Sequence, residues 1–349
     1  PIYIRSAAIW NALNRSGFKR ILNSRPALRA AEATVAFIHR AQVHDNKIEP
    51  FDIIEGDVFL ILDSFWGSLE GLNLAKSAAQ KGATVAVLIN DIFPITHPEY
   101  VDEHNIVRFK SLVPVALELA DYLFIPSQVT LAEIATHFYK GVMPKKHLVV
   151  KYGANLGAFR GPSRANTQRI ANSILMIGTV EPRKNHQQVF DWYLSNGRHN
   201  TQLTIIGKAG WLTKSLQNQM RMEAKVNPLF RWLDDASDEE LIFEMERHEI
   251  GIMASFAEGL GLPVLEMASH GLKLVLSDIP IFREVAGSEA SFFKLGSVEE
   301  LAIAIDTARS QNRQGSTQLA LWEDTAQEII DFLEKQQSST ANKSSSKSK

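Results

Sequence analysis

The chain has no cysteine among its 349 residues. This absence excludes a disulfide framework and thiolate metal ligands, and it fits a reducing compartment such as the cytoplasm. The chain also has no large excess of either charge, since its formal net charge is -2. A net charge this close to zero does not indicate a nucleic-acid partner. No apolar run approaches the roughly 20 residues that span a bilayer, so any association with the inner face of a membrane must be peripheral.

Short apolar segments alternate with helical patterns along most of the chain. The composition, 45% hydrophobic and 22% charged, is sufficient for two domains with cores of their own. Strands are expected at residues 34–38, 57–62, 84–89, 122–125, 148–151, 174–177, 202–206, 230–233, 250–253, 274–276 and 291–293. Helices are expected at 70–80, 112–120, 130–137, 187–194, 238–247 and 298–308. This alternation predicts an α/β fold of two Rossmann-like, doubly wound domains that face a central cleft.

Changes in composition divide the chain into five segments. Residues 157–168 are polar, unpatterned and contain Gly and Pro, which indicates a linker between a first domain at 1–156 and a second domain at 169–318. Apolar residues at helical spacing predict a helix at 319–335. The last segment, 336–349, is rich in Ser and Lys and is expected to be disordered.

The segment S-F-A-E-G-L-G-L-P-V-L-E at 255–266 is where we expect chemistry. It follows an apolar strand, and its glycines allow a close approach of backbone to ligand before Pro263 begins a helix. The amino end of a helix favours an anion such as a diphosphate. A purely structural turn needs the glycines, but it does not need Glu258 and Glu266 on either side of them.

A second motif, G-T-V-E-P-R-K-N-H at 178–186, follows the strand at 174–177. Arg183 offers a planar fork of donors and Lys184 a compact charge, and both suit phosphate oxygens. Two basic residues in a loop are more often simply solvated. Their place after the first strand of the second domain favours a role in binding.

These two motifs, together with H-G-L-K-L-V-L-S-D-I-P-I-F-R-E-V-A-G at 270–287, resemble the retaining glycosyltransferases of family 4, which have the GT-B fold. The resemblance covers essentially the whole second domain. In the first domain, residues 55–66 resemble a strand and loop of members that assemble polysaccharides such as O-antigen and often transfer mannose. The resemblance implies that the second domain binds a nucleotide-sugar donor and the first an acceptor. It also implies that the helix at 319–335 crosses back to the first domain, with Trp322 as an interdomain packing residue.

The resemblance also implies roles for single residues. Arg183 and Lys184 would hold the donor diphosphate, Glu258 would contact the transferred sugar, and Glu266 would bond the ribose. The remaining donor-binding residues supply backbone or line the nucleotide: Gly259, Leu260, Gly261, Leu262, Gly207 and Lys208.

The first domain carries a weaker resemblance. Residues 85–100 resemble a family segment with an H-D-x-x-P type motif, in which Asn90 stands here in place of His while Asp91 and Pro94 are retained. Asp91 is the candidate that orients the acceptor hydroxyl. The opening thirty residues match poorly and contain no Gly-rich loop, so the acceptor-side domain is expected to be incomplete or divergent at its start.

The resulting hypothesis is a retaining, metal-independent hexosyltransferase that moves mannose from GDP-mannose to a polysaccharide or lipid-linked glycan. It needs no cofactor, because the nucleotide sugar is a substrate, and a peripheral membrane or protein partner is compatible with it. Two alternatives stay open. One is a non-catalytic or incomplete GT-B module in a larger assembly, and the other is a nucleotide-sugar epimerase on the same fold.

Overall fold

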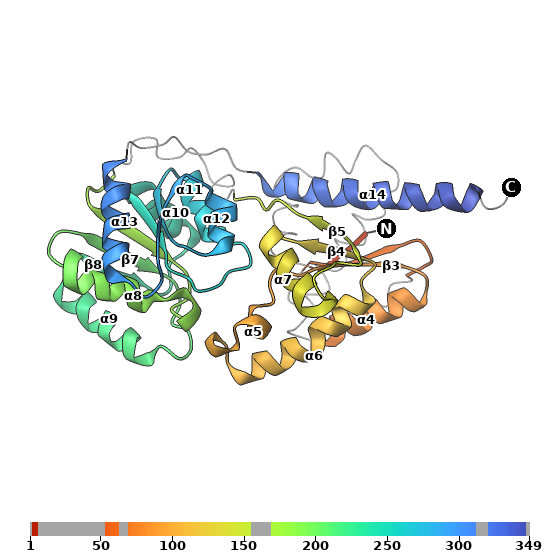
Figure 1. The fold of residues 1–349 in the computed structure, drawn as a ribbon, viewed down its shortest axis with the longest axis horizontal. Helices are drawn as coiled ribbons and strands as arrows, with labels where there is room; N and C mark the ends of the chain where they lie inside the picture. Colours follow the sequence, from red (N-terminus) through yellow and green to blue (C-terminus); the bar gives the residue numbers. More distant parts are fainter. Residues whose placement is uncertain (1, 6–52, 63–68, 155–168, 312–319, 347–349) are drawn as a thin grey trace. The chain divides into compact units, whose positions relative to one another are not determined.

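The computed structural model describes residues 2–5, 53–62, 69–154, 169–311 and 320–346. The chain divides into two compact units (Figure 1). The first comprises Pro1–Ile92, His104–Gly153 and Leu321–Lys349, and the second comprises Phe93–Glu103 and Ala154–Ala320. The sequence placed residues 93–103 in the first domain, whereas they pack with the second unit. The predicted linker at 157–168 lies outside the described residues.

The first unit is built on a parallel sheet in which the described strands follow one another in chain order. They are β1 (Ile2–Arg5), β2 (Val58–Ile61), β3 (Thr84–Leu88), β4 (Tyr122–Ile125) and β5 (Lys146–Val149). Strands β2 to β4 form where apolar runs were predicted, because most of their side chains are buried in a parallel sheet. Strand β5 overlaps the predicted 148–151 only at residues 148–149, and its residues are only partly buried or exposed. Strand β1 was not predicted, and it pairs in parallel with β2. The predicted strand at 34–38 lies outside the described residues.

Helices α4 (Leu69–Gln80), α6 (Glu103–Leu119) and α7 (Gln128–Tyr139) connect these strands. Helix α6 is longer than the predicted 112–120 and continues through Pro114. Helix α7 begins at a cap, since the Ser127 Oγ accepts a hydrogen bond from the Thr130 amide at 3.0 Å. A short helix, α5 (Phe93–Thr96), and the 3₁₀ turn η2 (Pro98–Tyr100) follow β3.

Helix α14 (Trp322–Ser346) packs on the first sheet through Ile329 and Leu333, which join Leu60 and Phe124 in one buried cluster. The sequence predicted disorder from 336 onward, but the helix continues to Ser346. No Gly or Pro interrupts this stretch, and Lys146 Nζ donates to the Gln336 side chain at 2.8 Å, which ties the start of the segment to β5.

Trp322, at the start of α14, was expected to pack between the domains. That role stays a prediction; within the first unit its ring lies 5.4 Å from that of Tyr152, measured between centroids, and its backbone passes close to Gly153. All three residues belong to the first unit. None of the helices in the described segments is both long and apolar enough to cross a membrane.

The second unit is built on a six-stranded parallel sheet, and all six strands form where the sequence predicted them. The strands are β6 (Ser173–Ile177), β7 (Gln202–Ile206), β8 (Phe230–Leu233), β9 (Ile250–Met253), β10 (Lys273–Ser277) and β11 (Ala290–Phe293). Their order across the sheet is β11-β10-β9-β6-β7-β8. The chain therefore reverses direction between β6 and β9, which is the switch point of a doubly wound sheet.

In the described residues of the second unit, helical segments alternate with these strands, among them α8 (His186–Trp192), the π-helical turn η4 (Tyr193–Gly197), α9 (Lys214–Val226), α10 (Asp238–Arg247), α11 (Leu262–Ser269), α12 (Pro280–Ala286) and α13 (Val298–Ser310). The sequence analysis missed α9 and α12. Helix α9 is mostly polar, and Leu216 and Met220 are the apolar side chains that it buries. Because few of its residues are apolar, the segment lacks the apolar runs by which the other helices were recognised.

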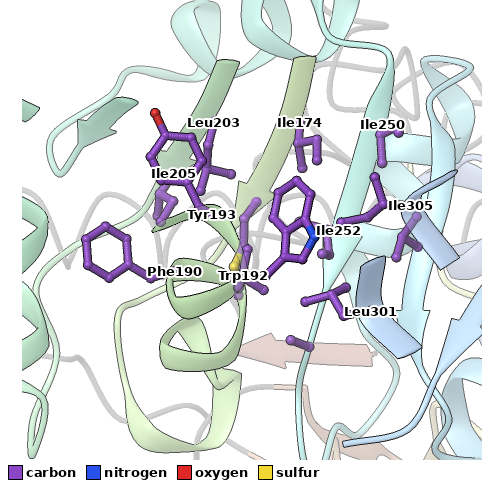
Figure 2. Packing of buried hydrophobic residues seen from close by; sticks show 14 of the residues in the cluster. Ile174, Phe190, Trp192, Tyr193, Leu203, Ile205, Ile250, Ile252, Leu301 and Ile305 are labelled. Atoms are coloured by element: carbon purple, nitrogen blue, oxygen red, sulfur yellow. The ribbon is translucent and has the colours of Figure 1, made fainter. Parts of the chain in front are cut away.

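The core of the second unit lies between the sheet and the helices α8, α9 and α13. Trp192 lies among Ile174, Ile252 and Leu301, and Tyr193 lies beside Leu203 and Ile205 (Figure 2). These aromatic side chains are fully buried. Because they join β6, β7 and β9 to the same helices, this core fixes the strand ends from which the functional loops leave.

Candidate functional site

Two loops meet at the switch point of the second sheet. Strand β6 pairs with β9 in parallel, so the loops that follow them leave from the same edge. The loop after β6 contains the 3₁₀ turn η3 (Pro182–Lys184), and the loop after β9 runs from Ala254 to Gly261. The Phe256 amide donates to the Arg183 carbonyl at 2.8 Å, which joins the two loops directly. The two sequence motifs are therefore brought together as predicted.

Glu258 lies at the centre of this junction and contacts both predicted cations. Its Oε1 is 2.5 Å from Lys184 Nζ, and its Oε2 is 2.7 Å from an Arg183 guanidinium nitrogen. Ser255 Oγ donates a third contact to Oε1 at 2.7 Å. The exposed fraction of the Glu258 side chain is only 8%, so these interactions take place largely away from water.

Arg183 is held from several directions. One terminal nitrogen donates to the Ala257 carbonyl at 2.6 Å, and the other pairs with Glu181 Oε1 at 2.7 Å. The guanidinium also lies over the Phe93 ring, with 4.3 Å between its central carbon and the ring centroid. Together with the pair to Glu258, these contacts fix the plane and the position of the guanidinium.

Lys184 reaches Glu258 by passing over Gly178. Gly178 has φ +140°, and a Cβ built there would lie 3.3 Å from Lys184 Cε. A residue with a side chain at this position would strain the backbone and press on the lysine stem. Gly178, the first residue of the G-T-V-E-P-R-K-N-H motif, therefore leaves room for the Lys184 side chain.

Glu181, Arg183, Lys184 and Glu258 form what we call the charge cluster. Burial would raise the pKa of Glu258, but the charges of Lys184 and Arg183 lower it to about 2, so this carboxylate is ionised at neutral pH. Burial raises the pKa of Glu181, with Arg183 and Lys184 acting in the opposite direction. With all four groups ionised, two cations face two anions and the cluster carries no net charge.

His186 follows the charge cluster at the start of α8 and is buried. Burial and the nearby Lys184 charge lower the pKa of His186 to about 3, with the Gly178 backbone acting in the opposite direction. The imidazole is therefore neutral at physiological pH. A neutral, buried ring at this position adds no third cation to the cluster.

Glu266 lies on α11, which begins at Leu262 after the turn Gly259-Leu260-Gly261. Gly261 has φ +82°, and a Cβ there would approach Phe282 to 2.8 Å, so both the conformation and the space require glycine. Burial and the Asp238 carboxylate raise the pKa of Glu266 to about 7, against the opposite effect of Lys184. The two carboxylates of the motif therefore differ in character, since Glu258 is firmly ionised and Glu266 titrates near neutrality.

Gly207 and Lys208, predicted to border the nucleotide, support the first loop through their backbone. A Cβ on Gly207 would lie 2.0 Å from the Gly178 carbonyl oxygen, so the two strand ends pack closely only because Gly207 has no side chain. The Val180 amide donates to the Lys208 carbonyl at 2.9 Å. The Lys208 side chain is exposed.

Asp91 belongs to the first unit, whereas the charge cluster belongs to the second. It follows β3 next to Asn90, whose Oδ1 accepts a hydrogen bond of 2.5 Å from the Tyr152 hydroxyl. Burial, together with the Asp91 charge, strongly raises the pKa of Tyr152. Asn90 is thus a hydrogen-bond acceptor within its unit, and the role of Asp91 stays a prediction.

Four residues of this region were missed by the sequence analysis: Glu181, Ser255, Asp238 and Phe93. Glu181 and Ser255 lie inside the recognised motifs, and a count of polar groups within bonding reach of Arg183 and Glu258 would have identified them. Asp238 and Phe93 are distant in sequence from the motifs, and no local pattern indicates that they approach Glu266 and Arg183.

Comparisons with known proteins bear on the family and the fold of the chain. Residues 164–328 match the family described as Glycosyl transferases group 1. The serotype-specific mannosyltransferase WbdA of Escherichia coli is 31% identical over 242 residues, which cover 64% of this chain and 30% of the relative. The O-antigen chain mannosyltransferase B of Escherichia coli is 32% identical over 116 residues, or 32% of this chain and 30% of the relative. The chain thus spans about 30% of the length of these relatives.

Solved structures show the same fold. A sucrose-phosphate synthase from Thermosynechococcus elongatus matches with a TM-score of 0.60 at 13% identity, over 81% of this chain and 74% of that one. HepE from Anabaena, solved with UDP and glucose, matches with a TM-score of 0.55 at 16% identity, over 83% of this chain and 78% of that one. The α/β fold of two Rossmann-like domains is confirmed, and so is the resemblance to GT-B glycosyltransferases of the O-antigen mannosyltransferase type.

Proposed function

We propose that this chain is a retaining glycosyltransferase that moves mannose from GDP-mannose to the growing glycan of an O-antigen or a similar polysaccharide. The observation that carries the proposal is the buried charge cluster at the switch point of the second sheet, where Lys184 and Arg183 converge on Glu258. The choice of mannose and of an O-antigen acceptor draws support from the names of the relatives.

The cluster suits the departure of a nucleoside diphosphate. When the sugar–phosphate bond breaks, negative charge builds up on the diphosphate, and a fixed cation in a dry site stabilises this charge more than it stabilises the ground state. Lys184 is 7% exposed, so its ammonium lies in a largely dry site beside Glu258. Side-chain cations of this kind fit a reaction that proceeds without a bound metal ion.

Glu258 is suited to accept hydrogen bonds from sugar hydroxyls. A general acid needs a pKa near the working pH, whereas two cations hold the pKa of Glu258 at about 2. This argues against a glycosidase, in which one of two carboxyl groups protonates the leaving group. Glu266, on the helix that follows, is proposed to bond the ribose, and Asp91 to orient the acceptor hydroxyl.

Retention follows if the acceptor attacks from the face that the diphosphate leaves. In that geometry a departing phosphate oxygen takes the acceptor proton, and no side chain of the second unit has to act as a nucleophile. The proposal of retention therefore rests on the resemblance and on the firmly ionised, ion-paired state of Glu258.

The test is turnover of GDP-mannose with a mannose-terminated glycan acceptor. Lys184→Ala should lower kcat by roughly 10²–10³-fold, the usual loss when one donor to a developing negative charge is removed. Lys225→Ala, an exposed lysine of α9, is the matched control and should keep full activity. NMR of the product gives the anomeric configuration.

Other outcomes would decide between the alternatives. Donor binding with neither hydrolysis nor transfer would favour a non-catalytic module in a larger assembly. Release of the sugar as its epimer would favour an epimerase. An inverted anomer would contradict the retaining mechanism while leaving the transferase intact.

A further inference from the structure

The charge cluster balances its own charges before any ligand arrives. Lys184 Nζ is 2.5 Å from Glu258 Oε1, and Arg183 bridges Glu258 and Glu181 with two contacts of 2.7 Å. With both carboxylates ionised, two cations and two anions leave no net positive charge to attract a diphosphate. The added negative charge enters a largely buried site, and a cation of the cluster that pairs with it is drawn from one of the existing ion pairs.

The contacts of the two cations indicate which pair is exchanged. Arg183 is fixed by Glu181, by Glu258 and by the Ala257 carbonyl, and its guanidinium lies over the Phe93 ring. The Lys184 ammonium has one hydrogen-bond partner among the described residues, Glu258, and it stands on a flexible four-carbon stem. Moving Lys184 breaks one contact, whereas moving Arg183 breaks at least three.

Glu258 also remains supported after Lys184 leaves. Ser255 Oγ still donates to Oε1 at 2.7 Å, and Arg183 still pairs with Oε2. The carboxylate therefore does not become an isolated buried charge. What changes is that Oε1 gains room for another hydrogen-bond donor.

We infer that Lys184 is a transferable cation, which leaves Glu258 for a phosphate oxygen when a nucleoside diphosphate binds, while Arg183 stays on Glu181 and Glu258 as a positioning residue. Glu258 and the diphosphate thus compete for Lys184. The exchange releases Glu258 Oε1 to accept a hydrogen bond from a hydroxyl of the transferred sugar, so donor binding prepares the carboxylate for its own role. This inference rests on the proposed function.

The first test removes the negative charge of Glu258, which competes with the diphosphate for Lys184. Glu258→Gln keeps the shape of the side chain but removes its charge, and it should bind GDP about tenfold more tightly than the wild-type chain, a difference of about 1.4 kcal/mol. Turnover should fall at the same time. Glu223→Gln is the matched control, since Glu223 is a buried carboxylate paired with Arg198 at 2.8 Å, and its GDP affinity should not change.

A double-mutant cycle separates exchange from simple repulsion. If Glu258 only repels the diphosphate, Glu258→Gln will tighten GDP binding equally in the presence and absence of Lys184. If the two compete for Lys184, most of the gain will disappear in the Lys184→Ala background. An unchanged gain in that background would overturn the exchange.

A structure of the wild-type chain with GDP gives a readout that does not depend on the folding of any variant. The Lys184 Nζ should lie within hydrogen-bond distance of a phosphate oxygen and no longer contact Glu258. A bound GDP with Lys184 still on Glu258 would contradict the inference alone. If neither the wild type nor Glu258→Gln binds any nucleoside diphosphate, the proposed function itself fails.

Discussion

At the scale of single residues, the site depends on where side chains are absent as much as on where charges are present. Gly178 leaves room for the Lys184 stem, and Gly207 allows the ends of β6 and β7 to pack closely. Within this frame, Glu258 gathers two cations at distances of 2.5 and 2.7 Å. Gly178 therefore leaves Lys184 the space to reach Glu258, and Lys184 and Arg183 together keep that carboxylate ionised.

Gly178→Ala should displace Lys184 and weaken binding of nucleoside diphosphates. The added Cβ would meet Lys184 Cε at 3.3 Å, in a backbone conformation with φ +140°. We expect a loss of about 1–3 kcal/mol in the free energy of unfolding from strain, together with lower GDP affinity. Gly141→Ala is the control, because Gly141 has φ +90° but nothing within 4 Å of its Cβ position. Denaturant unfolding and calorimetry measure the two effects, and equal GDP affinities in both variants would contradict the explanation.

Glu266 should make diphosphate binding depend on pH near neutrality. Its raised pKa of about 7 means that it is neutral below this pH and ionised above it. An ionised carboxylate accepts hydrogen bonds more strongly, so affinity should rise between pH 6 and pH 8. The diphosphate also titrates, and Glu266→Gln isolates its contribution. Parallel pH profiles for wild type and variant would rule out a contact between Glu266 and the nucleotide.

The limits of the sequence are clearest at this scale. Arg183, Lys184, Glu258 and Glu266 were identified from motifs, because charged residues beside glycines at strand ends are locally visible. Glu181 was not, because its role depends on the chain turning back at Pro182 so that its carboxylate meets Arg183. A sequence shows which charges are available, but it does not show how they pair.

At the scale of elements, the strands of the second unit followed directly from the sequence. Each is a short apolar run buried on both faces, which is the strongest local signal for a parallel sheet. Helix α9 was missed because its surface is largely polar. Segment 93–103 was assigned to the wrong unit, because its grouping depends on contacts of Phe93 and Tyr100 with Arg183 and Phe256.

Helix α14 is expected to contribute strongly to the stability of the first unit. Leu333 is 2% exposed within the cluster that joins this helix to the sheet. Leu333→Ala should lower the free energy of unfolding by about 2–5 kcal/mol, as for other buried leucines. Leu321→Ala, at a residue 44% exposed just before the helix, should have a much smaller effect. Similar losses for both variants in denaturant titrations would show that α14 does not pack as described.

At the scale of the whole molecule, stability should fall in mild acid because buried histidines resist protonation. Burial lowers the pKa of His248 to about 4, and its ring bonds Thr204 and the Glu244 carbonyl. A group whose folded pKa is depressed is protonated first in the unfolded chain, so stability is lost as pH falls from about 6.5 toward 4. Glu266 acts in the opposite sense, because its raised pKa favours the folded chain as pH falls below about 7.

Comparison of the wild type with His248→Gln isolates the contribution of His248 to the pH dependence of stability. Between pH 7 and pH 5 the wild type should lose about 2 kcal/mol more than His248→Gln, the amount that corresponds to about 1.5 pH units of differential protonation. His104→Gln, at an exposed position, should keep the wild-type slope. Urea titrations at the two pH values give the slopes. Parallel slopes for wild type and His248→Gln would mean that His248 is not held neutral.

The central claim is that the charge cluster binds a nucleoside diphosphate, and calorimetry tests it most directly. The chain is titrated with GDP, UDP, ADP and dTDP, with Lys184→Ala as the site-specific control and Lys225→Ala as the matched surface control. The account predicts selective binding of GDP, lost in Lys184→Ala and retained in Lys225→Ala. Binding that Lys184→Ala leaves unchanged, or no binding of any of the four nucleotides, would contradict it.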